Sequence, residues 1–567
     1  MKTKTIRNVL IIVPLAGLIL AGSGYGAYRV YVHARQTSLL KQARTLVEKA
    51  NTRKAQICLQ RVLRADPRNV EACRLMAELN DAGRSPGALF WRNRVVELKP
   101  DSMNDRLALA KTALSMRDYA TATNTMEGID AAGKKTAAYH NLAGTVASTL
   151  NQIPAAEEHF IEAARLEPSN PVPQLNLAVL RLHGTNAPAL AEARTVLKRI
   201  SANPTNATLR CQALRELVVD ALRTKQPATA LALAGDLMRQ TNSTFSDRLL
   251  RLTVIEQTGN AGLRAELADS HREAARGTNA AAKTCDMTLW HMQNGKVGAR
   301  EALTWLGGLP DTIQTNQSVA LLIAECQIAI QDWRSLQAAL EKQDWAELEF
   351  LRHAYKARSL RGQDLTGAAQ GEWVLALKAA NRQKGSLAML LRLAERWKWQ
   401  SEKEELLWSI VNQYPGEREA FNLLSRALMA GGRTQSLMML YSQEAKRRPS
   451  DLSVKNNLAM TALLLGAKEI KPHELAREVY QAAPDNPSFA STYAFSLHLQ
   501  KKDAEALKLM QQLRPGDLEA PAIAGYYALI LQATGEREKA KAYFQWGFRA
   551  QLLPEEKGLF NRARAGA

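Results

Sequence analysis

Residues 419–449 read EAFNLLSRALMAGGRTQSLMMLYSQEAKRRP, and this stretch decides the fold. Phe421, Leu424 and Leu428 recur at intervals of three and four residues, so they lie on one face of a helix. The Gly-Gly pair that follows ends this helix, because glycine readily adopts the left-handed conformation of helix C-termini. A second apolar series then leads to Pro449, and the residue before a proline disfavours continued helix. The stretch therefore predicts two helices joined by a tight turn.

The proline at the end of this unit belongs to a series with a nearly constant spacing. Steps of 31–36 residues, or twice such a step, separate Pro67, Pro100, Pro168 and Pro204, and then Pro415, Pro449, Pro484 and Pro515. A recurrence of this length is typical of stacked helical repeats. No stretch of the sequence alternates at period two, as half-buried strands do. The sequence therefore predicts an all-α chain of helix pairs.

The units resemble the tetratricopeptide repeat (TPR), in which small and bulky residues occupy set positions of two helices. Residues 137–168 and 522–550 match it well. The matching positions are Tyr139, Leu142, Ala143, Val146, Ala156, Phe160, Ala163 and Pro168, and then Ala524, Tyr527, Ala528, Leu531, Gly535, Ala540, Phe544 and Gly547. The resemblance implies a right-handed α-solenoid whose first helices line a concave face. Similar proteins use that face to hold a peptide, a tail or a helix of a partner.

The strength of the resemblance divides the chain into segments. TPR-like repeats are expected over 37–205 and again over 411–567, where a C-terminal cap ends the array. Between them, over 206–410, the prolines lose their spacing, but apolar residues still recur at helical intervals. We expect divergent, Trp-rich helical repeats there and no inserted domain. Residues 37–560 have room for about fifteen units of roughly 34 residues.

Residues 1–36 predict an N-terminal membrane anchor. Residues 9–28 carry no charge, and as a helix they are long enough to cross a hydrocarbon core of about 30 Å. Three basic residues precede them, which favours a cytoplasmic N-terminus and a large domain on the outer side of the membrane. Together with the resemblance, the single anchor implies a bacterial inner-membrane protein whose large domain is periplasmic. Basic residues also follow the span and weaken this assignment of orientation. A signal peptide cleaved near Ala21 is the competing interpretation.

The chain is strongly basic. Its 567 residues include 75 Lys and Arg against 55 Asp and Glu, a net charge of +20. Part of this excess lies in the basic stretch 29–64, directly after the predicted anchor. Two interpretations remain open, contact with anionic lipid and a solvated helix face. Nucleic acid is not expected as a partner, because no recognition fold is present and aromatic residues are not interleaved with the basic ones.

No motif in the sequence carries catalytic chemistry. The phosphate-binding loop, the nucleophile elbow and the His-Glu-x-x-His zinc motif are all missing from it. The nearest approach is His473-Glu474, where Arg477 stands in place of a second histidine. Five scattered cysteines form no metal or redox motif. We therefore expect no enzyme activity, cofactor or metal, and the alternative is an enzyme whose catalytic residues are hidden in 206–410.

Two sets of residues are candidates for partner binding. The resemblance places His140, Asn422, Arg426 and Asn456 on the concave face, where such side chains grip peptide backbone or carboxylate in similar proteins. The second set is the tryptophan cluster, which comprises Trp290, Trp305, Trp333, Trp345, Trp373, Trp397, Trp399 and Trp408. It is interpreted either as a groove with aromatic anchors or as a core filled by larger side chains. Trp397 and Trp399 cannot both face one way on a helix, so we expect at least one of them to be exposed.

These features together predict a membrane-anchored scaffold for protein–protein interactions. The anchor and the resemblance favour a bacterial role in assembling an envelope, secretion or polysaccharide-export complex. If the orientation is reversed, a cytoplasm-facing chaperone or regulatory adaptor is the alternative.

Overall fold

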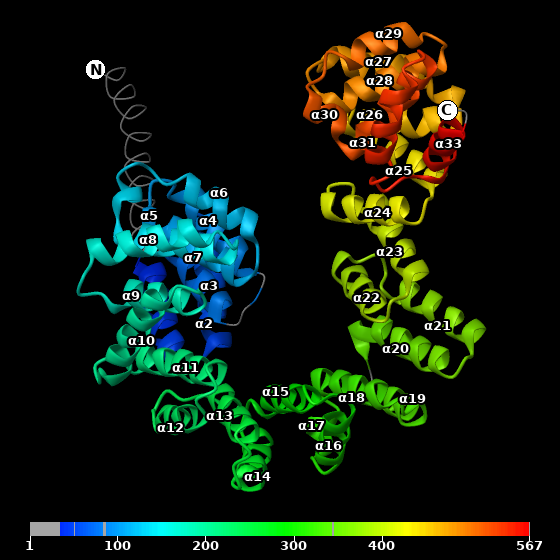
Figure 1. Ribbon diagram of the computed structural model, residues 1–567. Coiled ribbons are helices and arrows are strands. Elements are labelled where there is room, and N and C mark those ends of the chain that lie inside the picture. The colour runs from blue at the N-terminus through cyan, green and yellow to red at the C-terminus, as the bar shows by residue number, and fades with distance from the viewer. Residues whose placement is uncertain (1–33, 50, 83–84, 86, 343–344, 566–567) are drawn as a thin grey trace, which may run out of the picture. The chain divides into compact units, whose positions relative to one another are not determined.

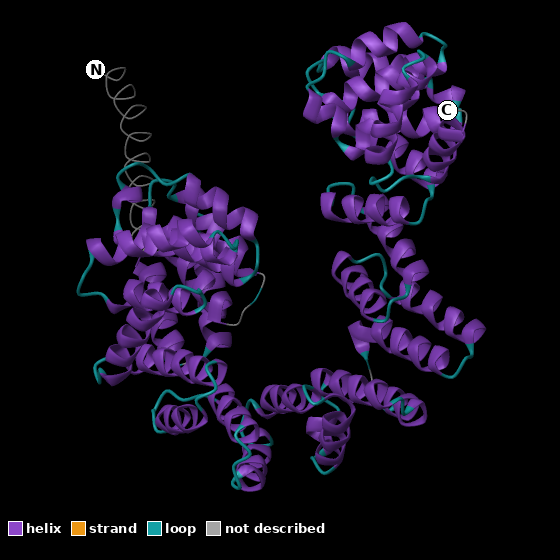
Figure 2. Cartoon of the chain, in the orientation of Figure 1, coloured by secondary structure: helices purple, strands orange, loops and turns teal. Residues whose placement is uncertain are grey.

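A computed structural model describes residues 34–565 except 50, 83–84, 86 and 343–344. These residues form helices and loops and contain no strand (Figure 2). The chain divides into two compact units, and the boundary between them in the sequence lies between Trp290 and His291. The predicted all-α class is confirmed.

The predicted membrane anchor at 9–28 lies outside the described residues, as does the beginning of the basic stretch 29–64. Among the helices that the structure describes, none is both long enough and apolar enough to cross a membrane.

The first unit is a succession of helices of similar length (Figure 1). After a helix over 34–48, its elements are α2 (Thr52–Ala65), α3 (Val70–Ala82), α4 (Gly87–Leu98), α5 (Met103–Ser115), α6 (Tyr119–Glu127), η1 (Gly133–Lys135), α7 (Ala137–Thr149), α8 (Ile153–Leu166), α9 (Pro171–Leu182), α10 (Ala187–Ala202), α11 (Ala207–Arg223), α12 (Pro227–Met238), α13 (Phe245–Gln257) and α14 (Leu263–Ala274). Helix α15 (Ala280–Met292) contains the boundary between the two units.

The second unit continues in the same manner. Its elements are α16 (Gly295–Gly307), α17 (Asp311–Gln314), α18 (Gln317–Ile330), α19 (Trp333–Glu341), η2 (Ala346–Leu348), α20 (Glu349–Gly362), α21 (Thr366–Ala379), α22 (Lys384–Arg396), α23 (Gln400–Gln413), α24 (Arg418–Ala430), α25 (Thr434–Arg447), α26 (Leu452–Leu465), η3 (Lys468–Ile470), α27 (Pro472–Ala482), α28 (Pro487–Leu499), α29 (Asp503–Met510), α30 (Pro515–Glu519), α31 (Pro521–Ala533), α32 (Arg537–Gly547) and α33 (Pro554–Ala565).

Consecutive helices pack against each other along each unit, and α7 with α8 shows how. Ala143 on α7 and Ala156 on α8 are buried, so the two helices approach closely. The buried Phe160 ring lies against Gly144, where an added Cβ would be only 2.7 Å from the ring. This contact of a small residue with a bulky one is the packing that the TPR resemblance implies. The resemblance is therefore confirmed at the level of fold.

The prolines that revealed the repeat lie mostly between helix pairs. Seven of the eight stand in the loop after a second helix, as Pro168 and Pro449 do. Pro515 differs, because it opens the short helix α30. Proline fits the start of a helix because its missing N–H would have no partner there.

The turns within pairs share a left-handed backbone position that several residue types occupy. Gly432 has the left-handed φ of +64° that glycine favours. Other turns reach the same conformation without glycine, at Lys225, Gln331 and Lys398, with φ of 55–62°. Asn151 and Lys501 do the same in the regular repeats, with φ of 60° and 64°, so this turn does not depend on glycine in either part of the chain.

Ion pairs join one helix pair to the next. Arg74 on α3 binds Asp105 on α5 with N–O distances of 2.6 and 2.8 Å. Arg215 on α11 makes the same two-pronged contact with Asp247 on α13. Burial raises the pKa of both carboxyls, but the hydrogen bonds and charges of their arginines, together with hydrogen bonds from Ser102 or Thr244, outweigh it and lower each pKa below its ordinary value. These buried carboxylates therefore hold neighbouring repeats in register.

Candidate partner-binding surfaces

The four residues expected on the concave face lie in different surroundings. His140 on α7 is half-buried, and its Nδ1 is 3.0 Å from Nδ1 of His159 on α8. Burial and then the charge of His140 hold the pKa of His159 below its ordinary value. His140 therefore already contacts the second helix of its own pair.

Asn422 and Arg426 are both exposed on α24. The Arg426 Nε donates to the Asn422 backbone carbonyl at 3.3 Å, so its guanidinium stays at the surface. Asn456 on α26 is buried, with 7 % of its surface exposed, and its Oδ1 has no hydrogen-bond partner among the described residues. Asn422 and Arg426 are thus accessible to a partner, whereas Asn456 is accessible only if neighbouring side chains move.

The tryptophan cluster forms core, and none of its eight members is exposed. Trp290, Trp345, Trp373 and Trp399 are buried, and the other four are half-buried. The expectation that Trp397 or Trp399 is exposed was therefore wrong. It assumed one continuous helix, but α22 ends at Arg396 and α23 begins at Gln400.

The turn between these helices brings the two indoles together. Lys398 has a φ of +60° and reverses the chain, so the ring centroids of Trp397 and Trp399 lie 4.9 Å apart. Trp399 also packs 5.6 Å from Trp373, and the Arg361 guanidinium stacks 3.8 Å from its ring. This arrangement occupies the faces of Trp399, which leaves Trp397 and Trp399 little surface for a partner.

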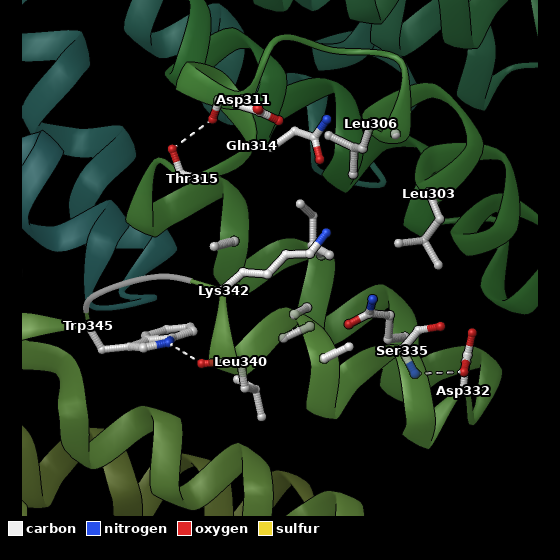
Figure 3. Close-up of a pocket in the computed structure, with 17 residues that line it drawn as sticks. Leu303, Leu306, Asp311, Gln314, Thr315, Asp332, Ser335, Leu340, Lys342 and Trp345 are labelled. Carbon is white, nitrogen blue, oxygen red and sulfur yellow. Dashed lines mark hydrogen bonds between the residues drawn. The ribbon is translucent and has the colours of Figure 1, made fainter.

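A cavity of about 410 Å³ opens between α16, α18 and α19 (Figure 3). Its floor is one face of α18, formed by Ala320, Ile323, Ala324 and Gln327 at helical spacing. Leu303 and Leu306 on α16 form one wall, and Ser335, Ala338 and Ala339 on α19 form the other. Because so many of these side chains are small, the two walls stand apart above α18.

Polar groups give this cavity a chemical character. Gln327 is 7 % exposed, and its Oε1 has no hydrogen-bond partner among the described residues. The Lys342 side chain extends across the cavity, and the Asp311 carboxylate stands at its rim (Figure 3). An unsatisfied acceptor on an apolar floor is costly, so a bound group that donates a hydrogen bond there would be stabilised.

Sequence reasoning missed this cavity, although it lies within the Trp-rich region. The alanines of α18 and α19 are no more frequent than those of neighbouring helices such as α15 and α21. Alanines at helical spacing are also typical of tight packing, so the sequence alone could not reveal a gap. Trp345 lines one end of the cavity, with its Nε1 donating to the Leu340 carbonyl at 3.0 Å.

Helix α2 carries an exposed basic stripe. Lys54, Ile57, Arg61 and Arg64 follow one another at intervals of three and four residues, and Ile57 is 43 % exposed. The helix contains no acidic residue. Within the part of the chain that the structure describes, the three basic residues form no ion pair, whereas Arg44 on the preceding helix pairs with Glu71.

The described residues contain no group of three or more His, Cys, Asp or Glu side chains arranged to hold a metal ion.

No family model matches the chain, and no curated protein matches its sequence. Among solved structures, it is similar to PilW, a widely conserved type IV pilus biogenesis factor, at 14 % identity over 43 % of this chain and 96 % of that one, with a TM-score of 0.27. It is also similar to a TPR protein from Parabacteroides merdae, at 14 % identity over 45 % and 98 % of the two chains, with a TM-score of 0.35. The APC/C hetero-tetramer Cut9–Hcn1 matches at 12 % identity over 82 % and 96 %, with a TM-score of 0.28. The fold assignment rests on the helix pairs of this chain itself.

Proposed function

We propose that the chain is a membrane-tethered scaffold that binds a partner protein through its helical repeats. The observation that carries the proposal is the cavity between α16 and α19, a gap in the array that the described helices leave open. Stacked helix pairs offer long surfaces on which an extended or helical segment of a partner is bound without a deep pocket. A partner segment with small apolar side chains fits the alanine-lined floor, and a polar N–H or O–H group would satisfy Gln327.

The membrane part of the proposal rests on residues 9–28 and on α2. The uncharged span would anchor the chain in a bacterial inner membrane, with the repeats in the periplasm. The unpaired basic stripe of Lys54, Arg61 and Arg64 would then lie near anionic headgroups, with the exposed Ile57 among them. A scaffold held in this way would serve assembly of an envelope, secretion or polysaccharide-export complex.

The test compares two substitutions of exposed helical alanines in the full-length chain. Ala338→Glu places a charge in the wall of the cavity, whereas Ala482→Glu changes an exposed alanine of α27 outside it. After crosslinking in native membranes, the wild type and A482E are expected to capture the same partner in equal amounts. A338E is expected to capture at least tenfold less of that partner. Equal capture by A338E and A482E would show that the partner does not bind in the cavity. Circular dichroism of both variants checks that the repeats remain folded.

A further inference from the structure

The last helix, α33, joins elements that are far apart in the sequence (Figure 1). It packs against α31 and α32, the pair just before it, and also against α26. At its start, the Thr434 hydroxyl of α25 donates to Glu555, across 121 residues of sequence. A helix that only covered the last repeat would need contacts with α31 and α32 alone. Helix α33 instead lies on a surface to which α25, α26, α31 and α32 all contribute.

Phe560 is the apolar anchor of α33. It is 1 % exposed, and its ring lies 5.3 Å from that of Tyr526 and 6.2 Å from that of Phe544. The ring fits because α31 has Gly525 beneath it, where an added Cβ would be 2.3 Å from the Phe560 Cε2. The repeats therefore provide a socket for one aromatic side chain.

Two carboxylates fix the first turn of α33. Glu555 accepts from Thr434, and Glu556 accepts from the Tyr526 hydroxyl and, at 2.7 Å, from the Leu553 backbone N–H. Burial raises the pKa of Glu556, although these hydrogen bonds act against it. Acidic residues in the first turn also complement the positive end of the helix dipole. The surface under α33 thus presents hydroxyl donors, on Thr434 and Tyr526, for an acidic helix start.

The polar side chains of α33 beyond its first turn face away from the repeats. Lys557, Asn561, Arg562 and Arg564 are exposed, while Leu559 and Ala563 are half-buried beside Phe560. The helix is therefore held along one narrow face, by an aromatic anchor and an acidic first turn. This is how an amphipathic helix binds in the groove of another protein.

We propose that the surface under α33 is a second interaction surface, and that α33 occupies it as an intramolecular ligand. The partner is a helix of another protein with two acidic residues in its first turn and an aromatic residue four or five positions later, like Glu555, Glu556 and Phe560. Such a helix binds by displacing α33. This inference rests on the proposed scaffold function, but it concerns a surface that is separate from the cavity between α16 and α19.

The test uses a fluorescent peptide with the sequence of residues 551–565 and the full-length chain in detergent. Phe560→Ala empties the aromatic socket, so the peptide is expected to bind this variant at least tenfold more tightly than it binds the wild type. Asn561→Ala, at an exposed position of the same helix, is the matched control and is expected to bind like the wild type. A peptide that carries alanine in place of its phenylalanine is expected not to bind.

Equal binding to the wild type and to F560A, or no binding to a folded F560A, would overturn the proposal. If F560A does not fold, hydrogen exchange of the wild type tests whether α33 leaves its surface. Amides of α33 are expected to exchange at least tenfold faster than those of α31, and equal exchange would show that α33 is a fixed part of the fold. A wild-type dimer in which α33 is exchanged between copies would also contradict the proposal, because the occupant would be a second copy. A338E is expected to leave peptide binding unchanged. Failure of the cavity proposal can therefore be distinguished from failure of the proposal for the surface under α33.

Discussion

The α7–α8 pair and the α20–α23 region build the same kind of helix packing from different residues. In α7–α8, alanines and Gly144 let the helices approach, and one phenylalanine fills the space between them. In α20–α23, tryptophans and arginines pack against one another, as Trp373, Trp399 and Arg361 do. A helical repeat can therefore keep its helix pairing while large aromatic side chains take a greater part in its core. The comparison also suggests where each region is most sensitive to substitution.

The largest effect is expected from Trp373→Ala. The side chain is fully buried, and its loss leaves a cavity that the rigid helices around it cannot fill. We expect a loss of about 3–5 kcal/mol in the free energy of unfolding, measured by urea denaturation. Trp408→Ala, at a half-buried position of α23, is the control and is expected to cost less than half as much. Equal costs would show that the tryptophans do not form the core of this region.

Removing an ion pair between repeats is expected to cost somewhat less. Asp247→Asn leaves Arg215 without its buried partner, and we expect a loss of about 2–4 kcal/mol at pH 7. Asp269→Asn, in the exposed pair with Arg272, is expected to change stability by less than about 0.5 kcal/mol.

The pH dependence of Asp247→Asn follows from the lowered pKa of Asp247. A carboxyl whose folded pKa lies below its unfolded value of about 3.9 stabilises the fold above that value, and this stabilisation is lost as the pH falls through the folded pKa. The difference between wild type and variant is therefore expected to be constant from pH 5 to 7 and to shrink below about pH 4. A difference that grows on acidification would contradict this assignment.

The regular pair can be tested at its closest contact. Gly144→Ala pushes a methyl group against the Phe160 ring, and we expect a loss of about 1–2 kcal/mol. Gly371→Ala in α21 has no atom of another residue within 4 Å of the added group, so it is expected to gain about 0.5–1 kcal/mol from better helix propensity. The opposite signs, read from thermal unfolding, would confirm that Gly144 lies in a close contact between helices and that Gly371 does not. A stabilised G144A would contradict it.

The smallest effect concerns the turns of the divergent region. Lys398 is exposed and has a φ of +60°, so Lys398→Gly is expected to stabilise by up to about 1 kcal/mol. Lys378→Gly, in the right-handed last turn of α21, is expected to destabilise by up to about 1 kcal/mol. If both variants lose stability equally, the left-handed turn is not strained.

The fold could be predicted from the sequence because its signals are local. The proline spacing marks the loops, and the positions of Ala143, Ala156 and Phe160 mark the packing between two helices. The signal that fails in the middle of the chain is the proline spacing, which is lost over 206–410. In that region, only the helical period of the apolar residues indicates the repeats.

The candidate surfaces could not be predicted in the same way, because they depend on distances between helices. The cavity exists because α16 and α19 stand apart above α18, and no local pattern records that separation. Trp397 and Trp399 were expected to diverge, but a turn between two helices makes their rings meet. The socket of Phe560 is formed by Gly525 on another helix, which only the folded chain brings beneath it.

Site-specific photocrosslinking at the cavity tests the central claim most directly. A photoreactive residue at Ser335, an exposed position in the α19 wall, would be compared with the same residue at Ala482 on α27. In native membranes, Ser335 is expected to crosslink to one segment of one partner protein, whereas Ala482 gives no specific product. The Ser335 product is also expected to disappear in A338E. Identical product patterns from the two positions would contradict the account of this chain as a scaffold that binds its partner between α16 and α19.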